Sequence, residues 1–213
     1  MPESTVPDQQ DGEFLLPVEA HGLKTMSMGY LSSAKTPMVW RGPMASSAMS
    51  QLLEKTLWGD IDVLLVDMPP GTGDIQLTLS QRATLSGAVI VTTPQDIALL
   101  DARKGIEMFQ KVEVPVLGLI ENMAAHVCTA CGQVEPLFGE AGGQHLAEQY
   151  DVPLLGQIPL DRAIREHSDQ GHPIVLADPE GPIAVVYQEA ALTLMAALGQ
   201  QRPASAPLIS MGD

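Results

Sequence analysis

Residues 62–74 read DVLLVDMPPGTGD, and this stretch decides the fold. Four apolar residues, 63–66, end abruptly at Asp67. The loop that follows holds two prolines and the glycines Gly71 and Gly73, and a second acid closes it. We interpret the stretch as a buried strand of a parallel sheet that delivers a carboxylate to the C-terminal edge, followed by a loop that changes conformation.

This pattern suits a nucleotide switch. In nucleotide-hydrolysing α/β proteins, an acid at this place holds the Mg²⁺ shell while the loop senses the γ-phosphate. The simpler alternative is a strand whose last residue caps a helix, and Asp67 alone would fit that alternative well. The double proline together with Gly71 and Gly73 does not fit, because a simple turn needs less backbone restriction. The stretch therefore favours a switch with Asp67 as its catalytic carboxylate.

Composition limits the classes of function. The chain has 213 residues, enough for one α/β domain with a sizeable core. Eleven basic against 26 acidic residues give a net charge of −15, which argues against a duplex nucleic-acid or anionic-membrane partner. No apolar run approaches the ~20 residues of a membrane span, and the acidic N-terminus is unlike a secretory signal. We expect a cytoplasmic protein.

Strand and helix patterns alternate along the chain, which predicts βαβ units, an α/β class and a mainly parallel layered sheet. Residues 1–20 are expected to be disordered or loosely packed, residues 21–200 to form the α/β domain, and residues 201–213 to be a disordered tail. Strands are expected at 14–18, 25–31, 62–67, 87–93, 115–120 and 154–158. Helices are expected from Pro43 to about 58, through Leu77 and Leu79, from Pro94 with Ile97, Leu100, Ile106 and Phe109 at helical spacing, at 143–150, from about Asp161, and at about 183–198.

Two cysteines form the second chemical signal. Cys128 and Cys131 lie in HVCTACGQVEP, within an irregular segment expected at 124–140. Two thiolates at this spacing suit Zn²⁺ or an iron–sulfur cluster, both of which normally take four ligands. Either His126 or His145 completes a zinc site, or a two-fold dimer brings two cysteine pairs together. A redox C-x-x-C is a further alternative, but that motif normally opens a helix, and here a glycine and a proline follow. Two incidental cysteines on a polar loop are the remaining alternative.

From about residue 21 to 200 the chain resembles the Mrp/ApbC iron–sulfur cluster carriers, a branch of the MinD/ParA-like P-loop ATPases. The matching segments are HGLKTMSMGYL, MVWRGPMASSA, LLVDMPPGTGDIQLTLSQ, GAVIVTTPQDIALLDARKGIEMF, VPVLGLIENM, the C-x-x-C loop and LLGQIPLD. The resemblance implies a [4Fe–4S] cluster that Cys128 and Cys131 share with a second subunit across a homodimer interface. It also implies transfer of that cluster to apo iron–sulfur proteins, with dependence on ATP and Mg²⁺.

The resemblance assigns nucleotide-binding roles as well. Asp67 matches the Walker B carboxylate, and MPPGTGD, with Gly71 and Gly73, matches the switch loop. Asn122 and the Pro159–Asp161 turn match positions that contact adenine. Simpler roles exist for these last residues: Asn122 tolerates unusual backbone angles at a strand end, Pro159 terminates strand pairing, and Asp161 caps a helix.

One departure from the family concerns the phosphate loop. No G-x-x-x-x-G-K-[ST] occurs in the chain, and none of its five lysines follows a glycine. We therefore expect an N-terminally truncated P-loop NTPase fold whose hydrolytic activity alone is doubtful, and an exposed apolar sheet edge. Two functions from different classes follow: a nucleotide-dependent cluster carrier, or a metal-binding scaffold that is not an ATPase.

Overall fold

The computed structural model describes residues 6–31, 42–68, 74–128 and 130–200. These residues form two compact units, residues 1–83 and residues 84–213, which are described separately. The tail at 201–213 and the glycines Gly71 and Gly73 lie outside the described residues.

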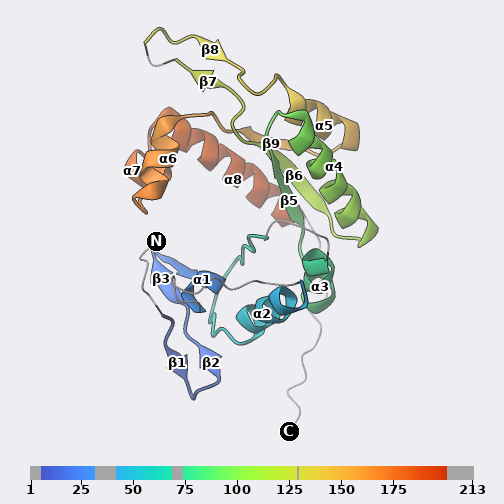
Figure 1. The fold of residues 1–213 in the computed structure, drawn as a ribbon, viewed down its shortest axis with the longest axis vertical. Helices are drawn as coiled ribbons and strands as arrows, with labels where there is room; N and C mark the ends of the chain where they lie inside the picture. The colour runs from blue at the N-terminus through green and yellow to red at the C-terminus, as the bar shows by residue number, and fades with distance from the viewer. Residues whose placement is uncertain (1–5, 32–41, 69–73, 129, 201–213) are drawn as a thin grey trace. The chain divides into compact units, whose positions relative to one another are not determined.

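A three-stranded parallel sheet forms the centre of the second unit (Figure 1). Its strands lie in the order β5 (Ala88–Thr92), β6 (Val116–Glu121) and β9 (Leu154–Gln157). In the register, Val91 pairs with Ile120, and Ile120 pairs with Gly156. The nearly continuous apolar run of β6 suits a strand with neighbours on both edges and helices on both faces. The predicted α/β class with a parallel sheet is confirmed.

Helices cover both faces of this sheet. Figure 1 shows α4 (Asp96–Lys111) and α5 (Gly142–Tyr150) on one side of the strands and α8 (Pro182–Gln200) on the other. Between the sheet and the first helix pair lies a core of Ile90, Ala102, Ile106, Leu119 and Leu146. Two shorter helices, α6 (Arg162–Asp169) and α7 (Ile174–Ala177), link β9 to α8.

Helix α8 packs closely against strand β9 at Gly156, which has no side chain. A Cβ at Gly156 of β9 would lie 3.2 Å from the Cβ of Ala190, which is buried in α8. Leu192 and Met195 of the same helix are exposed. Among the helices of the described ranges, α8 is the one that is long and apolar enough to cross a membrane, by length and composition alone. In this structure α8 packs against β9 and β6, so some of its apolar residues cover the face of the sheet.

The described residues of the first unit form short strands and three helices. Its elements are β1 (Gln9–Gln10), β2 (Phe14–Leu15), β3 (Val18–Ala20), β4 (Leu23–Thr25), α1 (Met28–Leu31), α2 (Gly42–Glu54) and α3 (Asp74–Arg82). Strands β1 and β2 form one antiparallel pair, and β3 and β4 form another. Three of these strands lie within residues 1–20, where the sequence predicts one strand, at 14–18. The strand expected at 25–31 is also replaced, from Met28 on, by helix α1.

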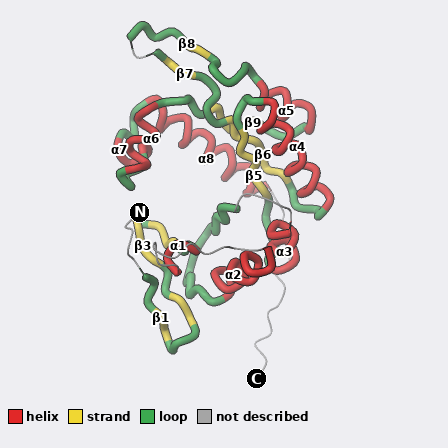
Figure 2. The backbone as a smooth tube through the Cα atoms, viewed as in Figure 1, coloured by secondary structure: helices red, strands yellow, loops and turns green. Residues whose placement is uncertain are grey.

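The predicted strand ending at Asp67 is wrong. Figure 2 draws the described part of the segment between α2 and α3 as loop, and residues 61–68 contain no strand. Leu65 is 81% exposed and Val63 is 44% exposed. A run of β-branched and leucine residues becomes a strand only when another backbone satisfies its N–H and C=O groups. Within the described residues, no strand pairs with 61–68.

Candidate metal centre and nucleotide edge

The two cysteines lie at the turn of a small antiparallel hairpin. Strand β7 (His126–Val127) pairs with β8 (Val134–Glu135), and Figure 1 shows this hairpin projecting beyond the parallel sheet. The N–H of Cys128 donates to the carbonyl of Gln133 at 2.9 Å, and the N–H of Gly132 donates to the carbonyl of Cys128 at 2.8 Å. Gly132 has a φ of +72°, which glycine adopts without strain. The turn therefore presents both thiols at the end of the hairpin.

The turn also favours the thiolate form of Cys128. Hydrogen bonds to its sulfur from the backbone N–H groups of Ala130 and Cys131 lower the pKa of the Cys128 thiol, and the Cys131 side chain adds to this effect. Cys128 is half-buried and Cys131 is exposed, and both are free thiols. Because the thiolate is the form that binds metal, Cys128 and Cys131 are suited to act as a pair of metal ligands.

Within the described part of one chain, only these two side chains form a ligand group. No group of three or more His, Cys, Asp or Glu side chains that could hold a metal ion occurs among the described residues. His126 Nδ1 is hydrogen-bonded to the carbonyl of Leu160, and His145 lies on α5. The structure therefore does not gather the third ligand that a zinc site with His126 or His145 needs. The thiols also do not open a helix, unlike those of a redox C-x-x-C motif.

Three other predicted site residues lie where β6 and β9 end. Asn122 follows β6 directly, and its Oδ1 accepts a hydrogen bond from the N–H of Met123, which has a φ of +56°. Pro159 follows β9 closely. Asp161 is the N-cap of α6, because its Oδ1 accepts a hydrogen bond from the N–H of Ala163 at 2.7 Å. The simpler role of Asp161 as a cap is thus present in the structure, whereas the unusual backbone angle at this strand end belongs to Met123 and not to Asn122.

Asp67 lies in the first unit, where it is exposed and outside any strand. The structure consequently does not present it on a sheet edge as the sequence predicted. The other predicted site residues that the structure describes belong to the second unit, where the segments that hold Asn122 and Pro159 are hydrogen-bonded neighbours and the cysteine pair lies apart on its hairpin.

Sequence reasoning missed the buried carboxylate of Glu121. This side chain is 1% exposed and accepts hydrogen bonds from the N–H of Gly143 and from Gln157 Nε2, the latter at 2.8 Å. It satisfies a backbone donor in the first turn of α5, whose N-cap residue, Ala141, makes no side-chain hydrogen bond. The sequence does contain one signal for this contact. Helix α5 begins with Gly142 and Gly143 and has no capping side chain before it, so its first N–H groups need an acceptor from elsewhere.

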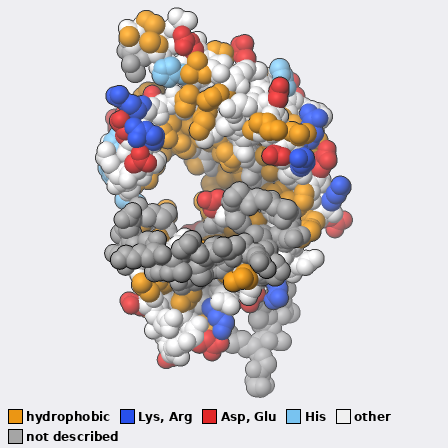
Figure 3. All heavy atoms as spheres, viewed as in Figure 1, with side chains coloured by type: hydrophobic (Ala, Val, Ile, Leu, Met, Phe, Trp, Pro, Cys, Tyr) orange, Lys and Arg blue, Asp and Glu red, His pale blue; other side chains and the backbone are white. Residues whose placement is uncertain are grey.

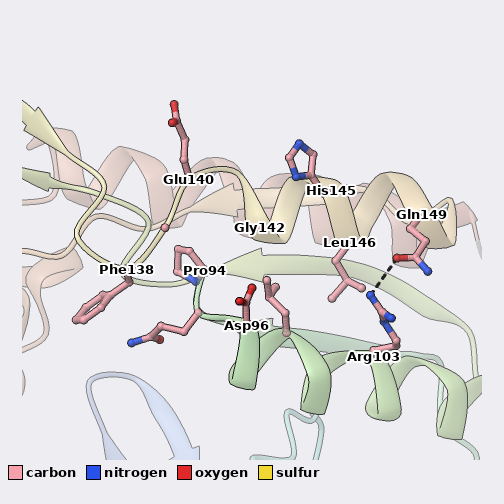
Figure 4. Close-up of a pocket in the computed structure, with 12 residues that line it drawn as sticks. Pro94, Asp96, Arg103, Phe138, Glu140, Gly142, His145, Leu146 and Gln149 are labelled. Atoms are coloured by element: carbon pink, nitrogen blue, oxygen red, sulfur yellow. Dashed lines mark hydrogen bonds between the residues drawn. The ribbon is translucent and has the colours of Figure 1, made fainter.

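A cavity of about 520 Å³ lies between α4 and α5 (Figure 4). Pro94, just after β5, and Phe138, just after β8, line one part of it, and Figure 4 shows Arg103 bonded to Gln149 at the other end. Of the candidate residues named from the sequence, His145 lines the cavity, whereas the cysteines, Asn122, Pro159 and Asp161 do not. It therefore differs from both the cysteine hairpin and the edge formed by Asn122 and Pro159.

A parallel sheet with helices on both faces, and a hairpin with two free thiols following its middle strand, define an α/β protein that offers a candidate pair of metal ligands. Comparison with known proteins makes the assignment specific. The chain belongs to the ParA family described as NUBPL iron-transfer P-loop NTPases, whose sequence model matches residues 2–195.

Relatives named "Iron-sulfur cluster carrier protein" are similar over most of the chain. The one from Pseudomonas fragi is 58% identical over 191 residues, which cover 90% of this chain and 67% of the relative. The one from Escherichia coli is 55% identical over 189 residues, which cover 89% of this chain and 51% of the relative. The chain thus spans about half to two thirds of the length of these relatives.

Solved structures agree with the fold. A nucleotide-binding protein from Archaeoglobus fulgidus, in complex with ADP and with Co, superimposes with a TM-score of 0.67 at 35% identity, covering 83% of this chain and 67% of that one. The cell division ATPase MinD of Pyrococcus furiosus gives a TM-score of 0.53 at 24% identity, covering 71% and 58%, and supports the fold alone. The predicted MinD/ParA-like architecture is confirmed.

Proposed function

We propose that this chain carries an iron–sulfur cluster, which two copies hold between their cysteine hairpins and deliver to apo iron–sulfur proteins. One observation carries the proposal: Cys128 and Cys131 form an accessible, thiolate-favouring pair that lacks further ligands among the described residues of its own chain. A [4Fe–4S] cluster takes four cysteine ligands, so a two-fold axis through the cluster completes the set. The names of the bacterial relatives support the carrier role.

The surface of the hairpin suits a second copy of the chain. Val127, Val134 and Leu137 are exposed by 43%, 61% and 57%, and Figure 3 draws hydrophobic atoms on the hairpin at the top of the view. Exposed apolar side chains next to metal ligands gain free energy when a partner covers them. Burial between two hairpins would also slow water and oxidants on their way to the cluster.

Dependence on ATP and Mg²⁺ is the finer part of the proposal. Asp67 would hold Mg²⁺, with Gly71 and Gly73 in the switch loop, and Asn122, Pro159 and Asp161 would contact adenine. The ADP complex of the Archaeoglobus fulgidus relative supports a nucleotide role. The present sequence does not fit a complete site, because it contains no phosphate-loop motif. We therefore assign no hydrolytic step to these residues.

Titration with a fluorescent ATP analogue separates this role from the scaffold alternative. Mg²⁺-dependent binding in the micromolar range would support the nucleotide-dependent carrier. A silent titration with a protein that still loads a cluster would favour a scaffold that works without ATP.

The expected partners and compartment follow from charge and cysteine use. A net charge of −15 disfavours nucleic-acid or anionic-membrane partners. Two free cysteines in a C-x-x-C arrangement fit a reducing compartment. On the part of the surface coloured in Figure 3, Lys and Arg side chains lie beside Asp and Glu side chains rather than in one basic patch. We accordingly place the carrier in the cytoplasm, with apo iron–sulfur proteins as its recipients.

Anaerobic reconstitution with iron and sulfide tests the proposal. The unmodified chain should gain the visible absorbance of a cluster and activate an apo-enzyme that needs a [4Fe–4S] centre. Cys128→Ala and Cys131→Ala should each lose both properties. Gln133→Ala is the matched control, because it lies on the same hairpin and keeps the backbone carbonyl that accepts from Cys128. Stoichiometric iron and sulfide in the double cysteine variant would overturn the ligand assignment.

A further inference from the structure

The hydrogen bonding between β6 and β9 continues past the ends of both strands. The N–H of Ile158 donates to the carbonyl of Glu121 at 2.8 Å, and the N–H of Ala124 donates back to the carbonyl of Ile158 at 3.0 Å. The N–H of Leu160 then donates to the carbonyl of Ala125 at 2.9 Å. Residues 121–125 and 158–160 therefore form one ladder that leads from the parallel sheet to the first residue of β7.

The last bond of this ladder comes from a side chain. His126 Nδ1 lies 3.1 Å from the carbonyl oxygen of Leu160, and the pair is partly buried. A carbonyl oxygen only accepts hydrogen bonds, so Nδ1 carries the proton and donates. His126 opens β7 and stands two residues before Cys128. The imidazole therefore joins the base of the cysteine hairpin to the segment that follows β9.

We propose that His126 is a positioning residue of the cysteine hairpin, acting through the Nδ1–H bond to Leu160 and not as a metal ligand. This inference rests on the proposed cluster-carrying function. Strands β7 and β8 pair with each other over two residues each, and neither packs extensively against another described helix or strand. Loss of one of the bonds at its base should let the thiols of the two copies depart from the geometry that a shared cluster needs.

The same ladder contains two residues of the proposed adenine edge. Asn122 stands between Glu121 and Ala124, and Pro159 stands between Ile158 and Leu160. The Asn122 N–H donates to the carbonyl of Thr92 at 2.7 Å, so the end of β5 is joined as well. The hairpin base and the adenine edge thus share one continuous set of backbone hydrogen bonds.

Two substitutions separate positioning from metal ligation. In His126→Asn, the amide nitrogen takes the place of Nδ1 and can still donate to Leu160, whereas the ring Nε2 is lost. In His126→Gln, the amide lies near the place of Nε2, and the bond to Leu160 is lost. A positioning role predicts that Asn behaves like the unmodified chain and that Gln behaves like Ala. A ligand role through Nε2 predicts that Asn, Gln and Ala are equally impaired. His145→Ala on α5 serves as the control for loss of a histidine elsewhere.

The first measurement is amide hydrogen exchange of the metal-free chain, which does not depend on cluster loading. His126→Ala and His126→Gln should speed exchange at Ala124 and Leu160 about fivefold, the factor expected for one lost hydrogen bond. His126→Asn and His145→Ala should stay within about twofold of the unmodified chain. Unchanged exchange in both Ala and Gln variants would overturn the inference.

The second measurement is the rate at which the loaded protein loses its cluster to an iron chelator. Ala and Gln variants should release it about fivefold faster, with Asn restoring the slow rate and the visible spectrum. Release from the Asn variant as fast as from Ala would contradict the positioning role. If the unmodified chain takes up no cluster, the proposed function fails, while the exchange measurement still decides whether His126 holds the hairpin.

Discussion

The carboxylate of Glu121, the last residue of β6, accepts a hydrogen bond from the N–H of Gly143 in the first turn of α5. This buried bond fixes the start of α5 against the carboxyl end of the middle strand. A Cβ at position 143 would lie 2.7 Å from Glu121 Oε2 and 2.9 Å from the Glu121 Cβ. The absence of a side chain at Gly143 is therefore what allows the carboxylate to reach the helix.

Gly143→Ala should destabilise the protein by about 2 kcal/mol, because the added methyl group displaces a fully buried side chain. Gly199→Ala in α8 is the matched control, since nothing lies within 4 Å of its added Cβ. That control should be neutral or stabilising by up to about 1 kcal/mol, as expected for a helical glycine. Urea unfolding followed by circular dichroism measures both. Equal effects of the two substitutions would contradict the role given to this contact.

Asp161→Ala should cost about 1 kcal/mol, because α6 loses the side chain that accepts from the N–H of Ala163. Asp161→Asn keeps an oxygen at the cap and should lie within a few tenths of a kcal/mol of the unmodified chain. The free energy of unfolding of the three proteins tests this. An Asn variant as unstable as the Ala variant would show that charge, and not the cap bond, matters at this position.

The thiol of Cys128 should react with iodoacetamide at lower pH than a free cysteine peptide. The backbone N–H groups of Ala130 and Cys131 lower the pKa of this thiol, so the reactive thiolate forms at lower pH. Mass spectrometry of the metal-free chain over a pH series gives the midpoint for Cys128, which we expect below the usual ~8.5. A midpoint at or above that of the peptide would mean that the turn does not stabilise the thiolate in solution.

Asp67→Asn tests the nucleotide switch in a longer chain to which a relative's phosphate loop has been joined. Hydrolysis of ATP should fall to the background rate, because the Mg²⁺ shell loses its carboxylate. Loading of the cluster should not change, because thiolate ligation is a separate task. Phosphate release and visible absorbance measure the two properties. Hydrolysis that survives the substitution would rule out the proposed role of Asp67.

Much of the second unit could be predicted from local sequence. The apolar runs that form β5, β6 and β9 are short and bounded by Gly, Pro or polar residues, and each was predicted to within two residues. Helix α4 was predicted for the same reason, although Ile97 and Leu100 of its apolar set are exposed. The four-residue helix α7 has no comparable signal and was not predicted.

Other features depend on partners distant in sequence. The side chain of Glu121 is hydrogen-bonded to Gly143 and Gln157, which lie 22 and 36 positions further along the chain. No local sequence pattern predicts these bonds. Strands β7 and β8 are only two residues long, so the cysteine hairpin looked irregular. The apolar residues before Asp67 were assigned to a strand from composition, but strand formation requires a neighbouring backbone, which the described residues do not provide.

The most direct test is the mass, in solution, of the protein loaded anaerobically with iron and sulfide. Because each chain contains only two cysteines, Cys128 and Cys131, we predict a dimer with one cluster for two chains, which returns to monomers when a chelator removes the iron. A particle that remains strictly monomeric with its inorganic centre intact would contradict the account.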